Sequence, residues 1–514
     1  MPWLALLFPP LVVLSAAHEL YLRNQAELDR TLGVLHPFWA AAAAAVVAAA
    51  LARRAGASAP FRVALWAYYL GGFAFLLWSF LRALPLADHL ALWTLDTAGG
   101  AAVFVGVFAV AVGAAARRAT PRSVEPLLAV LALVLGTREV FLFASRLDRS
   151  PLPGARDVAA EVGSRPRADL PNVYHLILDS FQDELFEVSR PRGGGSPFDG
   201  FVRFRATSPG RATAQVLPVL FTGRDLDGLR QDERVREGLV GGSSVLTDLR
   251  RAGYVTVGFV PRILYEQQPS ALDVSVFHEA NARGADVRAL HRSLFGRLFA
   301  YRVLPLAAVE GLARGHALAF DADFLRSAQG QRLSTYAQPI VSLQSLESLL
   351  EIEPRLPARG RYTLVHVLLP HNPYLLRSDC GHGAAAVPTD LVQQTDCTLQ
   401  LLTRFLDLLG KLGRLDAATV VVNGDHGAGE TWRDGRLLPD ETAWSRTLLL
   451  VKAAGARGAL RQANEAARIV DVAPTLLAVL GLPRDRHFDG RVLEEARPPL
   501  PGGDRLSAGS GAPR

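Results

Sequence analysis

Long apolar runs dominate the first 147 residues of this 514-residue chain, and the remainder alternates charged residues with short hydrophobic stretches. Hydrophobic segments lie near residues 3–17, 37–52, 63–85, 97–115 and 124–145. The third and the fourth are long enough to cross a hydrocarbon layer of about 30 Å. Residues 1–147 are therefore predicted to form a bundle of about five transmembrane helices, ahead of a domain of different character.

The fifth segment carries two charged residues, Arg138 and Glu139, near its end. Charged side chains are costly in the hydrocarbon region of a bilayer. We therefore expect both to face a neighbouring helix or to lie at the outer interface.

Basic residues mark alternate connections between the apolar segments. Arg53 and Arg54 follow the second segment and three arginines follow the fourth, whereas the connections after the first and third are mixed or acidic. The positive-inside rule then places the amino terminus inside and everything after Arg146 outside. The chain is expected to be a multi-pass protein of the inner (plasma) membrane with an extracytoplasmic, periplasmic domain.

The first segment has a second interpretation, as a signal peptide cleaved after Ser15-Ala16-Ala17. It lacks the basic start of such peptides and contains Pro9-Pro10, so a retained span is favoured. Both interpretations leave the large domain on the extracytoplasmic side.

The two cysteines, Cys380 and Cys397, both fall in the outer domain. An isolated pair in an oxidising compartment favours a disulfide, and two unpaired buried thiols are the alternative. The net charge of +6 comes from arginines spread along the chain, without a basic block that alternates with aromatic residues. Nucleic acid is therefore not expected as a partner.

The outer domain alternates two kinds of pattern after a proline- and glycine-rich stretch at 148–171, which predicts a linker. Strands are expected at 172–179, 255–260, 362–369, 418–423 and 446–452. Helices are expected near 244–252, 340–352, 390–410, 458–467 and 471–480. This alternation predicts an α/β fold with a mostly parallel sheet and helices on both faces, in a catalytic domain at 172–493. Residues 494–514 are predicted to be a disordered tail.

The strongest chemical signal is Gly424-Asp425-His426-Gly427, which follows the β-branched run 419–422. A second strand-like stretch, 172–178, ends on Asp179. Parallel sheets carry their sites outside the carboxyl ends of the strands, so two acidic strand ends predict a metal centre there. The alternatives are structural, with Asp425 or Asp179 as a helix N-cap and His426 in a turn.

Thr213 is the candidate nucleophile in the stretch 211–224. A hydroxyl is weakly nucleophilic at its normal pKa, and coordination to a metal ion can activate it. If Thr213 opens a helix, the free amides there also favour a phosphate or sulfate. An ordinary N-cap threonine is the alternative. Ser180 is a competing hydroxyl, expected to turn away from the site as a small residue at the strand end.

His371 lies in a proline-bounded loop just after the expected strand 362–369. From there it can reach an anionic substrate or protonate a leaving group. His366 lies within the strand, where a core position is expected.

These stretches resemble the alkaline phosphatase superfamily, in its sulfatase-like branch. Four of them occur in the family's order: 172–179, 213–223, His371-Asn372-Pro373 and 423–427. A fifth, 469–483 with Phe488-Asp489-Gly490-Arg491 after it, is similar to the helix near the end of sulfatase domains. Together they cover roughly residues 172–493, and the combination is specific although each piece alone is weak.

Five spans followed by an outer catalytic domain are similar to lipoteichoic acid synthases and lipid A phosphoethanolamine transferases. That resemblance implies a metal-bound threonine that becomes transiently phosphorylated, and Thr213 has the family's spacing, five residues before Pro218. It implies His371 as the substrate contact and, as ligands of one divalent ion, Asp179, Thr213, Asp425 and His426. A mixed oxygen and nitrogen ligand set suits zinc or manganese better than calcium.

The chain departs from those transferases at three points. Their first ligand is usually Glu, where this chain has Asp179; residues 427–486 contain no further histidine; and only one disulfide can form. The Cys-x-Pro-x-Arg signature of sulfatases is also absent. A formylglycine-dependent sulfatase is therefore not expected.

The sequence thus predicts a membrane-bound enzyme that moves a phosphoethanolamine- or phosphoglycerol-like head group to an envelope lipid or glycan through a phosphothreonine. A hydrolase with the same metal site, either a phosphodiesterase or an atypical sulfatase, is the first alternative. A catalytically degenerate envelope scaffold is the second, and the retention of all four candidate ligands argues against it. The donor, the acceptor, the metal and the oligomeric state stay open.

Overall fold

The structure is a computed structural model in which the chain forms two compact units. The membrane unit consists of Met1–Pro151, Arg283–Gln338 and Gly383–Pro388, and the sheet unit of Leu152–Ala282, Pro339–His382 and Thr389–Arg514. The structure describes the chain except for residues 1, 26–27, 29–31, 56–57, 84–97, 148–154, 164–165, 168, 191–195, 229–243, 266–271, 282–284, 304–332, 383–388, 434 and 498–514.

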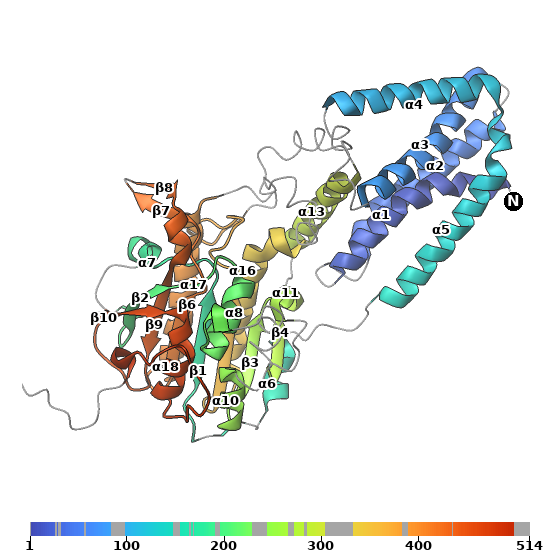
Figure 1. Cartoon of the computed structure of the whole chain (residues 1–514). Helices are drawn as coiled ribbons and strands as arrows, with labels where there is room; N and C mark the ends of the chain where they lie inside the picture. Colours follow the sequence, from blue (N-terminus) through green and yellow to red (C-terminus); the bar gives the residue numbers. More distant parts are fainter. Residues whose placement is uncertain are drawn as a thin grey trace, which may run out of the picture. The chain divides into compact units, whose positions relative to one another are not determined.

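Helices make up the described part of the membrane unit (Figure 1). They are η1 (Pro2–Leu7), α1 (Phe8–Asn24), η2 (Gly33–Leu35), α2 (His36–Arg54), α3 (Ala59–Ala83), α4 (Ala98–Arg118), η5 (Pro121–Ser123), α5 (Glu125–Arg146) and α13 (Ala285–Val303). Among the described residues, four helices are long and apolar enough to cross a membrane: Trp3–Asn24, Gly33–Arg54, Ala59–Leu77 and Glu125–Arg146. The remaining predicted segment, near 97–115, forms α4, which is not one of these four.

The charged residues near the end of α5 have partners on a neighbouring helix. Glu139 lies 3.0 Å from Nδ1 of His18 on α1, and Arg138 donates a hydrogen bond of 2.7 Å to Ser15 on the same helix. The expectation that Arg138 and Glu139 face a neighbouring helix is confirmed. These contacts satisfy charges that would be costly against lipid.

The sheet unit is built on eight strands in the order β10-β2-β9-β6-β1-β5-β3-β4 (Figure 1). Their bounds are β1 (Val173–Leu178), β2 (Val202–Thr207), β3 (Val255–Val260), β4 (Val274–Phe277), β5 (Arg361–Val367), β6 (Thr419–Gly424), β9 (Arg446–Lys452) and β10 (Arg461–Arg468). β9 is antiparallel to both of its neighbours, and the other pairs are parallel. The predicted α/β fold with a mostly parallel sheet is confirmed. A separate hairpin joins β7 (Glu430–Arg433) and β8 (Arg436–Pro439).

Helices cover both faces of this sheet. On β1, the ring of His175 lies 6.3 Å from Phe221 of α8 (Thr213–Thr222), and the ring of Tyr174 lies 5.5 Å from Phe405 of α17 (Leu391–Lys411). Consecutive strand residues point to opposite faces, so α8 and α17 lie on opposite sides. The other described helices are α6 (Ala155–Val162), α7 (Asp183–Ser189), η6 (Leu226–Gly228), α10 (Val245–Arg251), α11 (Arg262–Tyr265), α12 (His278–Asn281), α16 (Ser334–Ile352), η7 (Glu353–Arg355), η8 (Glu441–Ser445), η9 (Ile469–Asp471), α18 (Val472–Val479) and η10 (Glu494–Ala496).

One predicted helix is wrong. All five expected strands occur, as β1, β3, β5, β6 and β9, and four expected helices occur, as α10, α16, α17 and α18. Residues 458–467, however, contribute to strand β10, which pairs in parallel with β2. Ala463 and Ala467 are its buried residues. Alanine, glutamate and arginine favour a helix by propensity, but an edge strand can form from them when two small side chains are buried.

The structure also moves two predicted boundaries. Residues 283–338 were expected inside the catalytic domain and belong to the membrane unit instead. Residues 494–496 were expected to be disordered, but they form η10, where Glu495 accepts a hydrogen bond of 2.8 Å from the N–H of Asn464. The rest of the predicted tail, from 498 onward, lies outside the described residues, as does 148–154 of the predicted linker.

Candidate metal centre

Three predicted ligands lie at the carboxyl ends of two adjacent strands. Asp179 directly follows β1, and Asp425 and His426 follow β6. The two strands pair in parallel with Leu178 beside Gly424, so the residues that come next meet at the same edge of the sheet. All three side chains are buried there.

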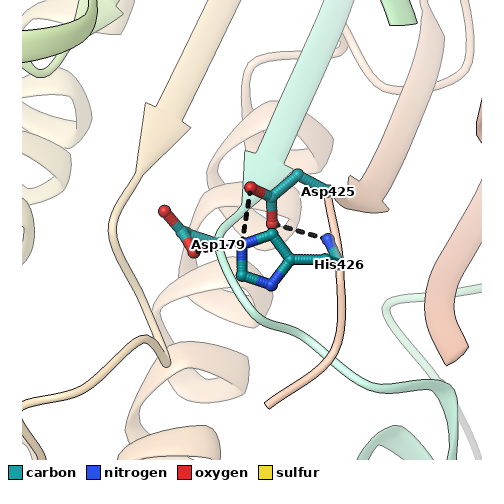
Figure 2. Close-up of side chains that lie close together, drawn as sticks. All are labelled: Asp179, Asp425 and His426. Atoms are coloured by element: carbon teal, nitrogen blue, oxygen red, sulfur yellow. Dashed lines mark hydrogen bonds and ion pairs between the residues drawn. The ribbon is translucent and has the colours of Figure 1, made fainter. Parts of the chain in front are cut away.

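The ligand atoms of these residues form one compact group (Figure 2). Atoms of Asp179, Asp425 and His426 that could bind a metal ion all lie within 4.8 Å of one another. Nε2 of His426 is 3.4 Å from Oδ2 of Asp425 and 3.8 Å from Oδ1 of Asp179. The structure therefore brings together residues that lie up to 247 positions apart in the sequence.

The hydrogen bonds around the group leave acceptor atoms facing one another. Nδ1 of His426 donates to the carbonyl of Gly427 at 2.8 Å. Nε2 therefore carries the lone pair, and it points toward the two carboxylates. Oδ1 of Asp425 accepts from the N–H of Ser180 at 3.0 Å, but its Oδ2 is buried without a hydrogen-bond partner among the described residues. Buried acceptors without donors are costly unless a cation binds them, so these residues fit a divalent metal ion.

The two carboxylates of the group also favour a positive charge on the His426 ring. Burial lowers the pKa of this imidazole, but the carboxylates of Asp425 and Asp179 outweigh burial, and its pKa is raised above the usual value. A proton and a metal ion would compete for the same Nε2 lone pair.

Close packing explains the two glycines that flank Asp425 and His426. A Cβ atom at Gly424 would lie 2.3 Å from Oγ1 of Thr447, and one at Gly427 would lie 1.9 Å from the carbonyl oxygen of Ala443. Only glycine lets the backbone come this close. A larger residue at either position would displace the pair.

Thr213 is the first residue of α8, and its side chain faces the group. Its hydroxyl donates to Oδ2 of Asp179 at 3.0 Å, and the residue is partly exposed. The N-cap is Ala212, which has no side-chain cap, so the interpretation of Thr213 as an ordinary N-cap is wrong. The start of a helix favours an anion, and this hydroxyl lies at the start of α8.

Ser180 turns toward the group, contrary to expectation. Its hydroxyl donates to Oδ1 of Asp179 at 3.1 Å and lies 3.4 Å from Nδ1 of His426. A left-handed backbone conformation, with φ of 62°, lets its N–H reach Asp425 as well. Ser180 is only 3% exposed, so its hydroxyl holds the ligands in place and is less accessible to a substrate than Thr213.

His371 lies beside the group in the loop after β5. Its ring centre is 6.4 Å from that of His426, and its side chain is partly exposed. Nδ1 donates to the carbonyl of Asn372, which leaves Nε2 for a substrate. His371 therefore lies close to the candidate metal ligands.

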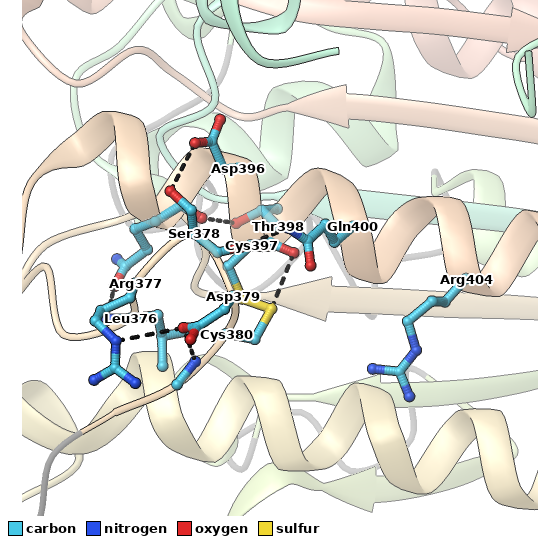
Figure 3. The surroundings of a disulfide bond; sticks show 12 residues. Leu376, Arg377, Ser378, Asp379, Cys380, Asp396, Cys397, Thr398, Gln400 and Arg404 are labelled. Carbon is cyan, nitrogen blue, oxygen red and sulfur yellow. Dashed lines mark hydrogen bonds and ion pairs between the residues drawn. A yellow bond between two sulfur atoms is a disulfide. The ribbon is translucent and has the colours of Figure 1, made fainter. Parts of the chain in front are cut away.

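One face of α17 holds the loop that carries His371. Gln394 donates to the carbonyl of His371 at 2.7 Å and accepts from the N–H of Leu375 at 2.8 Å. One turn further along, Cys397 forms a disulfide with Cys380 in the same loop (Figure 3). The predicted disulfide is confirmed. Gln394 has no signature in the sequence, because a glutamine on a helix becomes informative only when its partners are known.

Trp444 is a further neighbour of the group that the sequence did not indicate. Its ring centre lies 5.9 Å from that of His426, and its carbonyl accepts from the N–H of Gly427 at 2.9 Å. Gly429 packs against the indole so closely that a Cβ there would lie 2.4 Å from it. The half-buried indole therefore lies beside the candidate metal ligands.

Two more histidines lie deeper in the sheet. His366 is buried with Nδ1 2.9 Å from the hydroxyl of Tyr265, so the expected core position is confirmed. His175 lies 2.7 Å from both Tyr362 and Asn423. Burial lowers the pKa of each imidazole to about 4, so both are neutral and structural.

No family model and no curated protein matches the chain. Solved structures with a similar fold include a phosphonate monoester hydrolase of Agrobacterium radiobacter, at 16% identity, 66% of this chain, 78% of the other and a TM-score of 0.38. The lipoteichoic acid synthase LtaP from Listeria monocytogenes is similar at 14% identity, 65% of this chain, 80% of the other and a TM-score of 0.38. A protein in the alkaline phosphatase superfamily from Vibrio parahaemolyticus is similar at 15% identity. The match covers 67% of this chain and 73% of the other, with a TM-score of 0.40.

The superfamily that the sequence motifs resemble is thus represented among the similar structures. At these identities and TM-scores, similarity of fold says nothing about substrate or reaction. The chemistry has to come from the residues of the site itself.

Proposed function

We propose that this protein is a membrane-bound, metal-dependent transferase. It moves a phosphorylated head group from a membrane lipid to an envelope lipid or glycan through a phosphothreonine at Thr213. The observation that carries the proposal is the buried group of Asp179, Asp425 and His426 with the Thr213 hydroxyl bonded to Asp179. The chain also has apolar helices long enough to cross a bilayer. A protein anchored in a membrane in this way has lipid donors nearby.

The metal ion is proposed to bind Asp179, Asp425 and His426, with the Thr213 hydroxyl as a further ligand. Carboxylate, hydroxyl and imidazole ligands favour zinc or manganese. When bound, such an ion lowers the pKa of a coordinated hydroxyl and offsets the negative charge of a phosphoryl group.

The first half of the reaction forms the bond between Thr213 and phosphorus. Oγ1 of Thr213 attacks the phosphorus of the donor, and its proton passes to Asp179, to which it already donates a hydrogen bond of 3.0 Å. The bond from phosphorus to the diacylglycerol oxygen breaks, and that oxygen takes the Nε2 proton of His371 in its imidazolium form, while Nδ1–H stays on the carbonyl of Asn372. The products are diacylglycerol and a head group esterified to Thr213.

The second half transfers the head group to an acceptor. A hydroxyl of the acceptor gives its proton to His371 and attacks the same phosphorus, and Thr213 leaves with the proton held at Asp179. Water in place of the acceptor would give hydrolysis with the same residues. Proximity to lipid favours transfer, and product analysis separates the two.

The membrane topology is proposed to have five crossings. Glu125 at the start of α5 accepts two hydrogen bonds of 2.8 Å from Arg53 at the end of α2, so these helix ends lie on one side. Trp66 near the start of α3 donates to the carbonyl of Ala119, just after α4, at 3.3 Å. The chain leaves this side through α3 and is back on it after α4, so α4 is the returning crossing. Arginines mark this side as cytoplasmic, and the sheet unit then follows on the outer side.

Full-length protein in liposomes with head-group-labelled phosphatidylethanolamine or phosphatidylglycerol tests the proposal. After addition of Mn²⁺ or Zn²⁺, we expect label on Thr213, and then on an added glycan or lipid acceptor. Thr213→Ala should carry no label and form no product. Free labelled head group as the sole product would instead show a hydrolase. Absence of both labelled protein and product with either lipid and either metal would overturn the enzyme and favour a scaffold.

A further inference from the structure

Residues Arg283–Gln338 leave the sheet unit and join the membrane unit, although the chain on both sides of them builds the sheet unit. The helix described in this insertion is α13, Ala285–Val303. It contacts α1 and η2 of the membrane unit. The insertion therefore brings a helix from the middle of the sheet unit's sequence to the transmembrane helices.

One side of this helix is buried in the membrane unit. Leu290, Leu294, Phe295 and Leu298 are buried, at the spacing of one helix face. Phe38, at the start of α2, lies 5.7 Å from the ring of Phe295 and 4.6 Å from that of Phe299. These contacts hold α13 against the bundle.

Arginines lie on the rest of the helix surface. Arg288 and Arg292 are exposed, and Arg297 is partly exposed at the border of the apolar face. Within the described residues none of the three forms an ion pair. Exposed arginines on a helix that packs on apolar helices can reach the phosphate groups of lipids around those helices.

The partners of α13 mark one end of the helical bundle. α1 ends at Asn24 and α2 begins at His36, and η2 lies between them. Leu333, just before α16, donates its N–H to the Asn24 side chain at 2.8 Å, so the end of the insertion returns to the same place. Helices that cross a bilayer end near the lipid phosphates, and α13 is packed at such an end.

We propose that α13 is an interfacial helix whose arginines bind the phosphate groups of anionic phospholipids. Three guanidinium groups without acidic partners among the described residues match a surface of negative charge, and a guanidinium group can donate two parallel hydrogen bonds to phosphate oxygens. The inference needs a bilayer but not the transfer reaction, so it stands or falls separately from the proposed function. In the proposed topology, the leaflet bound is the outer one.

Hydrogen exchange of the full-length protein in nanodiscs tests this. The discs contain phosphatidylcholine alone or with about 30% phosphatidylglycerol, enough to give the surface a negative potential. Amides 288–298 should exchange on the order of tenfold more slowly in the anionic discs. The Arg288→Gln, Arg292→Gln, Arg297→Gln variant should lose this difference, and the same three positions changed to Lys should keep most of it.

A matched control changes Arg251, Arg404 and Arg457 to Gln, which are exposed in the sheet unit. It should behave as the unchanged protein. Equal exchange in the two kinds of disc would overturn the proposal. So would a glutamine variant whose α13 exchanges fast even in phosphatidylcholine, because the arginines would then be needed for the helix itself. Protection that requires a soluble anionic polymer, and not anionic lipid, would assign the arginines to a polymer partner and overturn lipid binding.

Discussion

At the scale of single residues, the candidate metal centre is a buried group of acceptor atoms that fits a cation. His426 directs Nε2 at two carboxylates, because its other ring nitrogen is committed to the carbonyl of Gly427. Asp425 keeps one buried oxygen without a donor among the described residues. Thr213 is partly exposed and hydrogen-bonded to Asp179, so we propose it as the hydroxyl that attacks a phosphoester.

Replacement of Thr213 tests that assignment. Thr213→Ala should lower turnover by on the order of 1,000-fold or more, because it removes the nucleophile, while Thr213→Ser should keep measurable turnover. Ser180→Ala is the matched control, since it removes the other hydroxyl bonded to Asp179 and should weaken metal affinity more than turnover at saturating metal. Label trapped on Ser180 in the Thr213→Ala protein would contradict the assignment.

Trp444 is expected to bind the organic part of the head group. An indole face beside the metal ligands attracts an ammonium group, so Trp444→Leu should raise KM for an ethanolamine-containing donor by about 2- to 10-fold with little change in kcat. Trp432→Leu, in the neighbouring strand β7, serves as the control. Equal KM values for Trp444→Leu and the unchanged protein would remove Trp444 from the substrate site.

Residues with a strand-end pattern could be predicted, and residues that act through tertiary contacts could not. Asp179, Asp425 and His426 follow apolar runs that the sequence marks as strands. Gln394 and Trp444 lie in segments without such a pattern, and their roles depend on neighbours that are distant in sequence.

At the scale of elements, α17 positions the loop that carries His371. Gln394 and Cys397 are one turn apart on its surface, and each holds a different part of the loop. The loop itself has little regular structure, so the position of His371 depends on these two anchors.

Gln394→Leu should therefore lower kcat by about 10- to 100-fold, because the hydrogen bonds that fix the loop are lost and His371 is misplaced. KM should change less. Gln400→Leu is the control on the same helix, since its side chain is exposed and, among the described residues, bonds only to the carbonyl of Ser378. A similar kcat for Gln394→Leu and Gln400→Leu would show that the anchor does not act on the chemistry.

Strand β10 shows why element prediction failed at one place. Its residues are good helix formers, and only two alanines are buried. Strands β1 and β6 are buried along their whole length and carry β-branched residues, so their identity could be predicted from composition. β10 is a strand because it pairs with β2, which lies far away in the sequence. The order of polar and apolar residues within β10 does not reveal this pairing.

At the scale of the whole molecule, the chain combines apolar helices with a sheet unit whose core contains neutral histidines. Burial keeps the pKa of His175 at about 4, against a usual value of about 6.5. Between these values the unfolded chain binds more protons than the folded one, so the free energy of unfolding falls as the pH drops through this window.

For one such histidine the full loss is up to about 3 kcal/mol between pH 6.5 and pH 4. His175→Gln should flatten the pH dependence of chemical unfolding of the sheet unit in that range. His487→Gln, at a side chain that is 73% exposed, should leave the dependence unchanged. Identical slopes for His175→Gln and the unchanged protein would contradict a neutral His175 in the core.

The division into units shows the limit of prediction at this scale. The change from apolar to mixed composition near residue 147 indicated a membrane part and an outer part. The insertion 283–338 has no such change in composition, and its place in the membrane unit follows from contacts such as Phe38 with Phe295. A helix with polar and apolar faces fits either unit until its partner is known.

The most direct test of the central claim is the metal content of the full-length protein. Purified protein is loaded with Zn²⁺ or Mn²⁺, freed of excess metal and measured by elemental mass spectrometry beside Asp425→Asn and the control Asp416→Asn, a side chain that is 71% exposed. The group of Asp179, Asp425 and His426 predicts about one ion per chain in the unchanged protein and the control, and at least a roughly tenfold loss in Asp425→Asn. No stoichiometric ion in the unchanged protein, or the same content in Asp425→Asn, would contradict the metal centre.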